Sequence, residues 1–327
     1  MNLEQLPYVS LAHLPTPIDE LPRLSQELGG PRLLVKRDDQ TGLATGGNKI
    51  RKLEFLMGEA LDQGADMVIT AGAAQSNHCR QTAAAAAHVG LGCALVLGGE
   101  PTPTPTGNLL LDQLLGAKIY WTGPDRRGER LEEIADQVRA DGHQLYVIPY
   151  GGSNVVGATG YVLAMQELVK QQLGELRVDR IVFASSSGGT QAGMVVGARA
   201  TGFGGEIIGV KIDKGEVGDD PYTLRLARLA NETAAHVGLD SKFTPDDFLV
   251  AEDYLGGGYG VVGELEREAI QLTARLEGLI LDPVYTGRAM GGLIDMIRRG
   301  LIGSDETVLF WHTGGMPAVF SYVDALV

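Results

Sequence analysis

The feature that most constrains the fold is a regular alternation of short apolar segments with longer segments of helical pattern. The short segments are rich in β-branched and other apolar residues and do not alternate with polar ones. Such segments are typical of strands buried on both faces of a sheet. The longer segments between them suit helices that cross from one parallel strand to the next. The sequence therefore predicts a doubly wound α/β architecture with open, twisted parallel sheets.

These patterns give a specific set of predicted elements. The strands are expected at Met67–Ala71, Cys93–Leu97, Lys118–Thr122, Gln144–Pro149, Arg180–Ala184, Glu206–Ile212, Leu279–Asp282 and Thr307–His312. The helices are expected at residues 77–89, 108–115, 131–140 and 190–200. The repeated Pro-Thr sequence at Pro101–Thr106 predicts a stiff surface loop.

Length, charge and cysteine content narrow the class of protein. A chain of 327 residues is long enough for two domains. A formal net charge of −14 makes nucleic acid and anionic membranes poor partners. Two cysteines, Cys79 and Cys93, are too few for a disulfide framework, and their spacing does not suit metal ligands, so we expect no metal. Cys79 is expected to be a buried apolar residue. Neither a signal peptide nor an apolar window of about 18 residues is present, so we expect a cytoplasmic protein.

Two glycine-containing segments lie where an α/β sheet would bind a ligand. Gly46 and Gly47 precede Asn48 and Lys49, and a lysine in this place could form an imine with an aldehyde cofactor. The alternative is a simple turn followed by an exposed lysine. Judged on this stretch alone, the turn is the favoured interpretation. The Ser185–Thr190 segment follows a strand and could cradle a phosphate at a helix start, or could be an ordinary capped turn. It matches neither a dinucleotide fingerprint nor a P-loop.

Polar residues follow three other predicted strands or apolar segments. Gln75–His78 could position a ligand, although N-capping by Ser76 or Asn77 explains it too, and His78 alone suits a structural role better. Asp282–Gly287 and His312–Gly315 could hold groups that act on protons, or could be turns. The adjacent Asp38 and Asp39 are interpreted as structural, because neighbours in a strand point to opposite faces.

Taken in order, these motifs resemble one family of enzymes. The sequence is similar to the D-cysteine desulfhydrase and 1-aminocyclopropane-1-carboxylate deaminase family, which has the tryptophan-synthase-β-like, type II pyridoxal-phosphate fold. The stretches that carry the resemblance are Val35–Asp39, Gly46–Lys49, Arg51–Glu54, Gln75–His78, Leu281–Tyr285 and His312–Gly315. They span most of the chain, and their conjunction in this order is far more specific than any one of them.

The resemblance implies a cofactor, pyridoxal 5'-phosphate, and the residues that bind it. Lys49 would hold the cofactor as a Schiff base and move protons. Asn77 would bind its 3-hydroxyl group, and Thr286 and Thr313 would also lie against it, Thr286 near the pyridine nitrogen. The phosphate would be bound by Ser187, Gly188, Gly189 and Thr190.

The resemblance also implies a small amino-acid substrate and its contacts. Ser76 would face the substrate carboxylate, and Tyr259 and Tyr285 would flank the substrate. The catalytic set would be Lys49, Ser76, Tyr259 and Tyr285. The substrate-binding set would be Ser76, Asn77, His78, Tyr259 and Tyr285.

Two positions separate the activities within the family. The ring-opening deaminases carry Glu at the position of Thr286 and Leu at that of Thr313. A carboxylate keeps the pyridine nitrogen protonated and the ring a strong electron sink, whereas a hydroxyl supports that charge poorly. The resemblance thus predicts β-elimination from D-cysteine, which gives pyruvate, sulfide and ammonia, with Lys49 as the base that removes the α-proton.

Several alternatives remain at this point. The second candidate for the substrate is L-cysteate, which would release sulfite. Its sulfonate would need an added cation, which Arg288, Lys211 or Lys214 could supply. The deaminase activity is less favoured, and a non-enzymatic phosphometabolite-binding protein on the same scaffold is the rival from another class. The resemblance also implies a homodimer, and a division into a larger cofactor-binding domain of residues 1–48 and 162–327 and a smaller α/β domain of residues 49–161.

Overall fold

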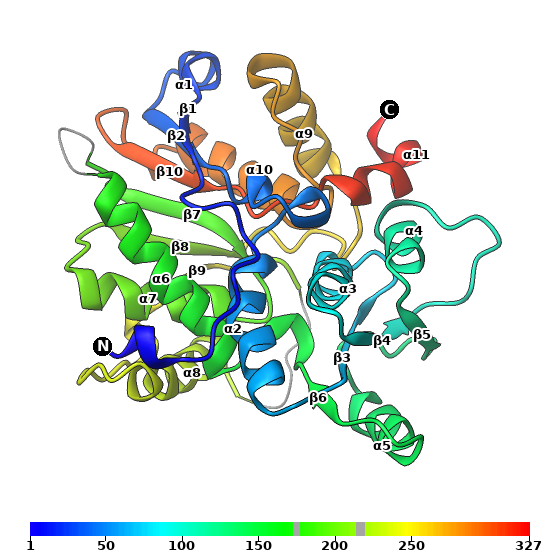
Figure 1. The fold of residues 1–327 in the computed structure, drawn as a ribbon. Helices are drawn as coiled ribbons and strands as arrows, with labels where there is room; N and C mark the ends of the chain where they lie inside the picture. The colour runs from blue at the N-terminus through cyan, green and yellow to red at the C-terminus, as the bar shows by residue number, and fades with distance from the viewer. Residues whose placement is uncertain (173–176, 214–219) are drawn as a thin grey trace.

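The computed structural model describes residues 1–172, 177–213 and 220–327. Within these residues the strands form a six-stranded sheet, in the order β1-β2-β10-β7-β8-β9, and a four-stranded sheet, in the order β5-β4-β3-β6. Figure 1 shows the two sheets on either side of the helix α2 (Lys49–Asp62). The predicted α/β class with parallel sheets is therefore confirmed.

The six-stranded sheet is covered by helices on both faces. Its strands are β1 (Ile18–Glu20), β2 (Arg32–Lys36), β7 (Arg180–Ser185), β8 (Glu206–Lys211), β9 (Leu249–Ala251) and β10 (Thr307–Trp311). One face packs on α1 (Pro22–Leu28), α9 (Glu264–Glu277) and α10 (Thr286–Arg298), and the other on α6 (Val155–Gln171), α7 (Gly189–Thr201) and α8 (Tyr222–His236). The apolar strand segments are therefore buried on both faces, as their lack of alternation predicts.

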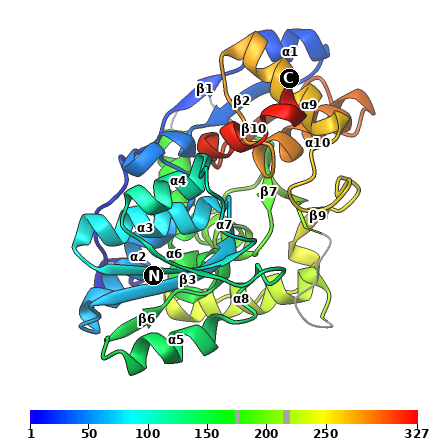
Figure 2. The same cartoon turned by 90° about the vertical axis from the view of Figure 1, so that its right-hand side faces the viewer.

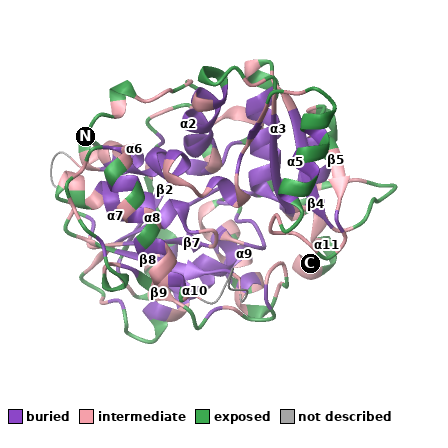
Figure 3. Cartoon of the chain, turned by 90° about the horizontal axis from the view of Figure 1, so that it is seen from below, coloured by how far each residue is buried: buried purple, intermediate pink, exposed green. Residues whose placement is uncertain are grey.

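The four-stranded sheet is built in the same way. Its strands are β3 (Met67–Ala73), β4 (Gly92–Gly98), β5 (Lys118–Trp121) and β6 (Leu145–Val147), all parallel. One core joins this sheet to α2, α3 (Asn77–Val89) and α4 (Gly107–Leu114), and a second core joins it to α5 (Leu131–Ala140). Figure 2 shows α5 on the outer side of this sheet, and Figure 3 shows its exposed face beside the buried helix α3.

Most predicted elements are confirmed to within two residues, but one strand is wrong. Leu279–Asp282 forms no strand and pairs with none of the described strands. The strand that it approaches, β10, already pairs with β2 on one side and β7 on the other, so no sheet edge is free there. Leu279 and Leu281 are buried in the core around α10 and serve packing alone. The expectation of parallel pairing also fails at one edge, where β1 is antiparallel to β2.

Other simple expectations can be checked directly. Residues 101–104 and 106 of the Pro-Thr loop are exposed, and Cys79 and Cys93 are both buried free thiols. No helix in the part of the chain that the structure describes is long and apolar enough to cross a membrane. The domain boundaries stay a prediction, and the one after residue 161 would fall inside α6.

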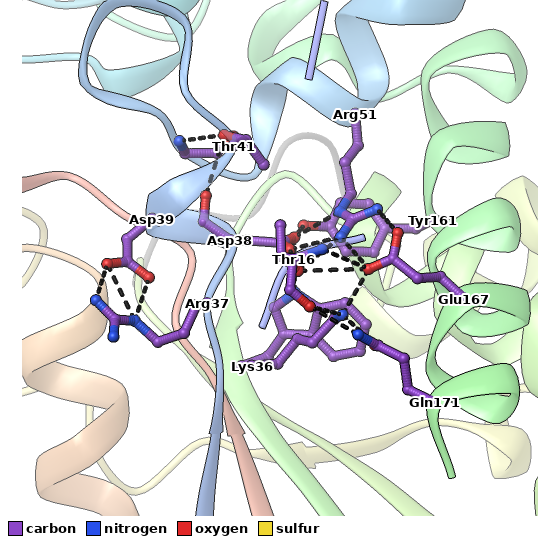
Figure 4. Close-up of polar contacts among 12 residues, drawn as sticks. Thr16, Lys36, Arg37, Asp38, Asp39, Thr41, Arg51, Tyr161, Glu167 and Gln171 are labelled. Atoms are coloured by element: carbon purple, nitrogen blue, oxygen red, sulfur yellow. Dashed lines mark hydrogen bonds and ion pairs between the residues drawn. The ribbon is translucent and has the colours of Figure 1, made fainter. Parts of the chain in front are cut away.

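A buried ionic network connects the two halves of the molecule (Figure 4). Asp38 follows β2, and its carboxylate accepts two hydrogen bonds from the Arg51 guanidinium, at 2.8 and 2.9 Å. Tyr161 and Trp311 each donate to the same carboxylate at 2.7 Å. Arg51 also pairs with Glu167 of α6 at 2.9 Å. The network thereby joins α2 to β2, β10 and α6.

The ionised form of the Asp38 carboxyl is stabilised by its hydrogen-bond partners. Burial alone would raise the pKa of the Asp38 carboxyl, but the charge and hydrogen bonds of Arg51 lower this pKa below its ordinary value. Asp38 is fully buried, so its carboxylate depends on these donors to replace water. The interpretation of Asp38 as structural is consistent with these contacts, although Asp38 and Asp39 lie in a 3-10 turn (Asp38–Gln40) and not in a strand.

We predict that Asp38→Asn destabilises the protein by about 3–5 kcal/mol, because it removes the fully buried one of the two carboxylates that pair with the buried Arg51 charge. Asp19→Asn is the matched control, since the Asp19 carboxylate that pairs with Arg37 is 47% exposed, and its loss should cost less than about 1 kcal/mol. Denaturant unfolding followed by circular dichroism measures both. Equal midpoints for the two variants would show that the buried network contributes little.

Candidate active site

A pocket lies between the two sheets, at the carboxyl ends of β3, β6, β7 and β10. The start of α2 contributes Asn48 and Lys49, and the start of α3 contributes Ser76, Asn77 and His78. The other lining residues are Tyr150, Gly151, Ala184, Ser185, Ser186, Ser187, Gly188, Thr190, Tyr285 and Thr313. The structure therefore gathers most of the predicted site residues around one cavity, from segments far apart in the sequence.

Lys49 is the first residue of α2 and points into this pocket. The loop before it turns sharply, with Gly46 at a φ of 68°. A Cβ atom on Gly46 would lie 2.2 Å from the Asp39 carbonyl oxygen, so only glycine fits there. The Lys49 Nζ donates to the Gly151 carbonyl at 3.1 Å, and burial lowers the pKa of its amine to about 8. A useful fraction of this amine is therefore neutral near physiological pH.

A second lysine, to which the sequence analysis gives no role, lies beside the first. Lys52 is one helical turn further along α2, and its Nζ donates to the Gly151 carbonyl at 3.1 Å and to the Ser153 Oγ at 3.2 Å. Burial, and then the nearby Lys49 charge, lower the pKa of the Lys52 amine well below its ordinary value. The spacing of three residues on one helix face is the signal that could have indicated this pair.

Lys52 and Ser153 border the Ser185–Thr190 segment between β7 and α7. The Gly189 amide donates to the Ser153 Oγ at 3.1 Å. A Cβ atom on Gly189 would lie 2.8 Å from that oxygen and 2.9 Å from the Lys52 Nζ, so a side chain would fill this space. Ser187, Gly188 and Thr190 line the pocket here, whereas Gly189 lies just behind it. A helix start, two hydroxyl groups and a lysine around one end of a pocket form an arrangement that binds anions.

The predicted residues at the start of α3 have both capping and pocket-facing roles. Ser76 is confirmed as the N-cap, since its Oγ accepts a hydrogen bond from the Cys79 amide at 3.2 Å. The His78 Nε2 lies 2.9 Å from the Thr70 Oγ1, and its Nδ1 has no partner among the described residues. Burial lowers the pKa of His78 well below its ordinary value, so its imidazole is neutral at pH 7.

Three tyrosines stand at one end of the pocket. Tyr285 lines it, and its hydroxyl lies 2.7 Å from that of Tyr259, which is placed behind it. Burial raises the pKa of both phenols well above the ordinary value, so both stay protonated. Tyr150 lines the pocket after β6, and the Arg126 guanidinium lies 4.1 Å above the Tyr259 ring. Tyr150 directly follows the predicted strand Gln144–Pro149 and precedes Gly151 and Gly152, a signal in the sequence that could have marked it as a site residue. No such signal marks Arg126.

Thr286 lies behind the wall of the pocket and is fully buried. Its hydroxyl donates to the Asp282 carboxylate at 2.8 Å and accepts from the Asp282 amide at 2.7 Å. Because its single proton is used by Asp282, this hydroxyl can only accept a hydrogen bond from any other group. Thr313 follows β10 and lines the pocket itself.

The basic residues considered for an anionic substrate are engaged elsewhere. Arg288 donates to Glu266 at 2.6 Å and to the carbonyls of Ile212 and Gly258. Lys211 pairs with Glu252 at 2.9 Å. Lys214 lies outside the described residues.

Comparison with known proteins identifies relatives over nearly the whole chain. The family model described as "Pyridoxal-phosphate dependent enzyme" matches residues 9–314. A D-cysteine desulfhydrase from Klebsiella pneumoniae (strain 342) is 43% identical over 330 residues, which cover 98% of each chain.

Solved structures give the same result. The crystal structure of an ACC deaminase homologue matches with a TM-score of 0.90 and 40% identity, over 99% of this chain and 96% of that one. A hydrogen sulfide-producing enzyme from Fusobacterium nucleatum matches with a TM-score of 0.67 at 14% identity, over 93% of this chain and 96% of that one. The second likeness is one of fold alone.

The lowered pKa of Lys49 can be tested by the pH dependence of amine labelling. In the cofactor-free protein, reductive methylation of Lys49 should rise about tenfold per pH unit and level off above about pH 8, because the neutral amine is the reactive form. The exposed Lys118 serves as the control and should keep rising beyond pH 9. Peptide mass spectrometry measures both residues, and identical profiles would contradict the environment described for Lys49.

Proposed function

Because the chain belongs to the family of pyridoxal-phosphate dependent enzymes, we propose that it is a carbon–sulfur lyase that acts on D-cysteine. The products would be pyruvate, sulfide and ammonia. The observation that carries the proposal is the amine of Lys49, which combines a pKa of about 8 with a place between the anion-binding segment and the tyrosines. The relationship to a D-cysteine desulfhydrase supports the choice of substrate.

The residues of the pocket fit pyridoxal phosphate. Gly189 lies so close to Ser153 and Lys52 that a Cβ atom there would clash, and these donors stand beside the part of the cavity lined by Ser187, Gly188 and Thr190, which suits a phosphate. Lys49 would hold the cofactor covalently, and Ser187, Gly188, Gly189, Thr190 and Lys52 would hold its phosphate. We assign the remaining cofactor contacts to Asn77, Thr286 and Thr313.

The substrate side of the proposal uses the residues on the opposite wall. When bound, pyridoxal phosphate withdraws electrons from the α-carbon of an amino acid, which makes the α-proton acidic and allows a β-substituent to leave. Lys49 would take the α-proton as a neutral base, which its lowered pKa permits. Ser76, with Asn77 and His78, would hold the substrate carboxylate and amine.

The tyrosine pair suits the departure of sulfide. Tyr259 and Tyr285 share a hydrogen bond of 2.7 Å, and both phenols are protonated. Tyr285 faces the pocket and would donate a hydrogen bond to the leaving sulfur, while Tyr259 supports it from behind. The overall reaction consumes one water, and D-cysteine becomes pyruvate, hydrogen sulfide and ammonia.

The pocket favours D-cysteine over the alternatives. A sulfonate would need an added cation, but Arg288 and Lys211 are engaged with carboxylates and carbonyls. Ring opening by a deaminase would need a strongly protonated pyridine nitrogen, and the Thr286 hydroxyl offers no charge to support one. A binder without catalysis would have no use for a buried amine of lowered pKa beside an anion site.

Lys49→Ala should reduce pyruvate and sulfide release from D-cysteine by about 10²–10⁴-fold, because the base is lost. Lys118→Ala, an exposed lysine, is the control and should keep wild-type rates. Lactate dehydrogenase coupling measures pyruvate, and wild-type protein should release pyruvate and sulfide in equal amounts. The proposal would be refuted if the Lys49 variant kept a large part of the activity. It would also be refuted if the wild type released sulfite from L-cysteate faster than sulfide from D-cysteine.

A homodimer in the cytoplasm is also part of the proposal. The two buried free thiols suit a reducing compartment. Exposed apolar side chains gather where α4 packs beside the 3-10 helix η6 (Met316–Ser321) and the following α11 (Val323–Leu326). They are Leu110, Leu114, Met316, Phe320 and Val323. Exposed apolar side chains on neighbouring elements are typical of a subunit interface.

Light scattering at micromolar concentration tests the dimer. We expect twice the mass of the 34.7 kDa chain for the wild type, and a shift toward the monomer for Phe320→Glu, which would place a charge in the interface. Leu301→Glu, at an exposed apolar residue on another part of the surface, is the control. A wild-type monomer would contradict the proposal.

A further inference from the structure

We propose that Asn108 and Arg80 are positioning residues that fix the side-chain amide of Asn77, so that Asn77 offers an N–H donor and not its carbonyl oxygen to the ligand. Asn77 lines the pocket, and Asn108 lies behind it on α4. The proposal rests on the proposed function, in which Asn77 meets the 3-hydroxyl oxygen of the cofactor.

The fixed point of this arrangement is the guanidinium of Arg80, which is fully buried within α3. Its Nη1 donates to the carbonyl oxygens of Ala44 at 2.8 Å and Gly46 at 2.7 Å, and its Nε donates to the Asn108 Oδ1 at 3.1 Å. A guanidinium has donors only. The side chain that meets it must therefore present an oxygen, which fixes the orientation of the Asn108 amide.

A second contact fixes Asn108 independently. With its oxygen toward Arg80, its Nδ2 faces the other way and donates to the backbone carbonyl of Gln75 at 3.0 Å. A backbone carbonyl can only accept, so this contact requires the same orientation of the amide. The Asn108 backbone amide also donates to the Gln75 side chain at 2.9 Å. Asn108 is thus held between an obligatory donor and an obligatory acceptor.

The orientation of Asn108 then decides that of Asn77. The Asn108 Nδ2 donates to the Asn77 Oδ1 at 2.8 Å, so the carbonyl of Asn77 is turned away from the ligand. The remaining Nδ2 of Asn77 makes no hydrogen bond with the described residues, and it faces the backbone of Gly315 beside the pocket. A Cβ atom on Gly315 would lie 2.6 Å from this nitrogen. Asn77 is therefore left with an oriented donor.

A donor in this position favours an ionised oxygen on the ligand. It should therefore bind a phenolate-like 3-oxygen and gain nothing from a ring that lacks this oxygen. Arg80 also holds the Ala44 and Gly46 carbonyls of the loop that leads to Lys49, where Ala44 has a φ of 43°. One buried guanidinium thus positions both the amine and the amide that face the cofactor ring.

The test compares the binding of pyridoxal phosphate with that of its 3-deoxy analogue, which lacks the hydroxyl. Both are titrated into the full-length, cofactor-free protein, and the dissociation constants are read from absorbance and from quenching of protein fluorescence. The wild type should bind pyridoxal phosphate about tenfold or more tightly than the analogue, as expected for a hydrogen bond to a charged oxygen. This ratio does not depend on turnover.

Asn108→Leu should reduce the ratio to about threefold or less, because the Asn77 amide is then free to turn. Gln113→Leu, at an exposed position of the same helix, is the control and should keep the wild-type ratio. If Asn108→Leu does not fold, Asn108→Asp replaces it. The aspartate still gives Arg80 an acceptor but has no donor for Asn77, so we again expect the ratio to fall.

The outcomes separate this inference from the proposed function. A wild-type ratio in the Asn108 variant, or a wild-type protein that binds both ligands equally, would overturn the positioning role while leaving the cofactor in place. A wild-type protein that binds neither ligand would overturn the proposed function itself.

Discussion

The buried pairing of Asp38 with Arg51 is the interaction on which the arrangement of the site depends. It joins the end of β2 to the first turn of α2, and Lys49 is only two residues before Arg51. Tyr161 of α6 and Trp311 of β10 also donate hydrogen bonds to the Asp38 carboxylate. Because a fully buried carboxylate must be satisfied by donors, these four elements are held in one relative position. The position of the Lys49 amine follows from it.

Parallel strand topology then assembles the rest of the pocket. Parallel pairing brings the carboxyl ends of β7 and β10, with the segments that begin at Ser185 and His312, to the same edge of the six-stranded sheet. The end of β3, followed by Ser76, lies in the other sheet and faces the same pocket. The helices that follow β3 and β7 start there, so their free amides face the cavity. The chemistry of the pocket is therefore divided between an amine from α2, amides from α7 and phenols from the C-terminal part of the chain.

The sequence alone predicts the parts of this structure that depend on local patterns. The strands and helices between Met67 and Val147 are correct because continuous apolar runs and helix caps mark them. The error at Leu279–Asp282 arises because an apolar run shows burial but not pairing, and both edges of β10 were already taken. Asn108 could not be assigned a role, since its contact with Asn77 is made between elements that only the tertiary structure brings together. Lys52 and Tyr150 carry a signal in their positions, one helical turn after Lys49 and directly after a predicted strand, but only the structure shows what they contact.

The central claim is that Lys49, and not its neighbour, carries the cofactor. Both lysine amines donate to the Gly151 carbonyl at 3.1 Å, so the structure presents a close competitor in Lys52. Borohydride reduction of the protein loaded with pyridoxal phosphate, followed by peptide mapping by mass spectrometry, distinguishes the two residues. We expect the added phosphopyridoxyl group on Lys49 alone. Its presence on Lys52, or its absence from both residues, would contradict this account of the site.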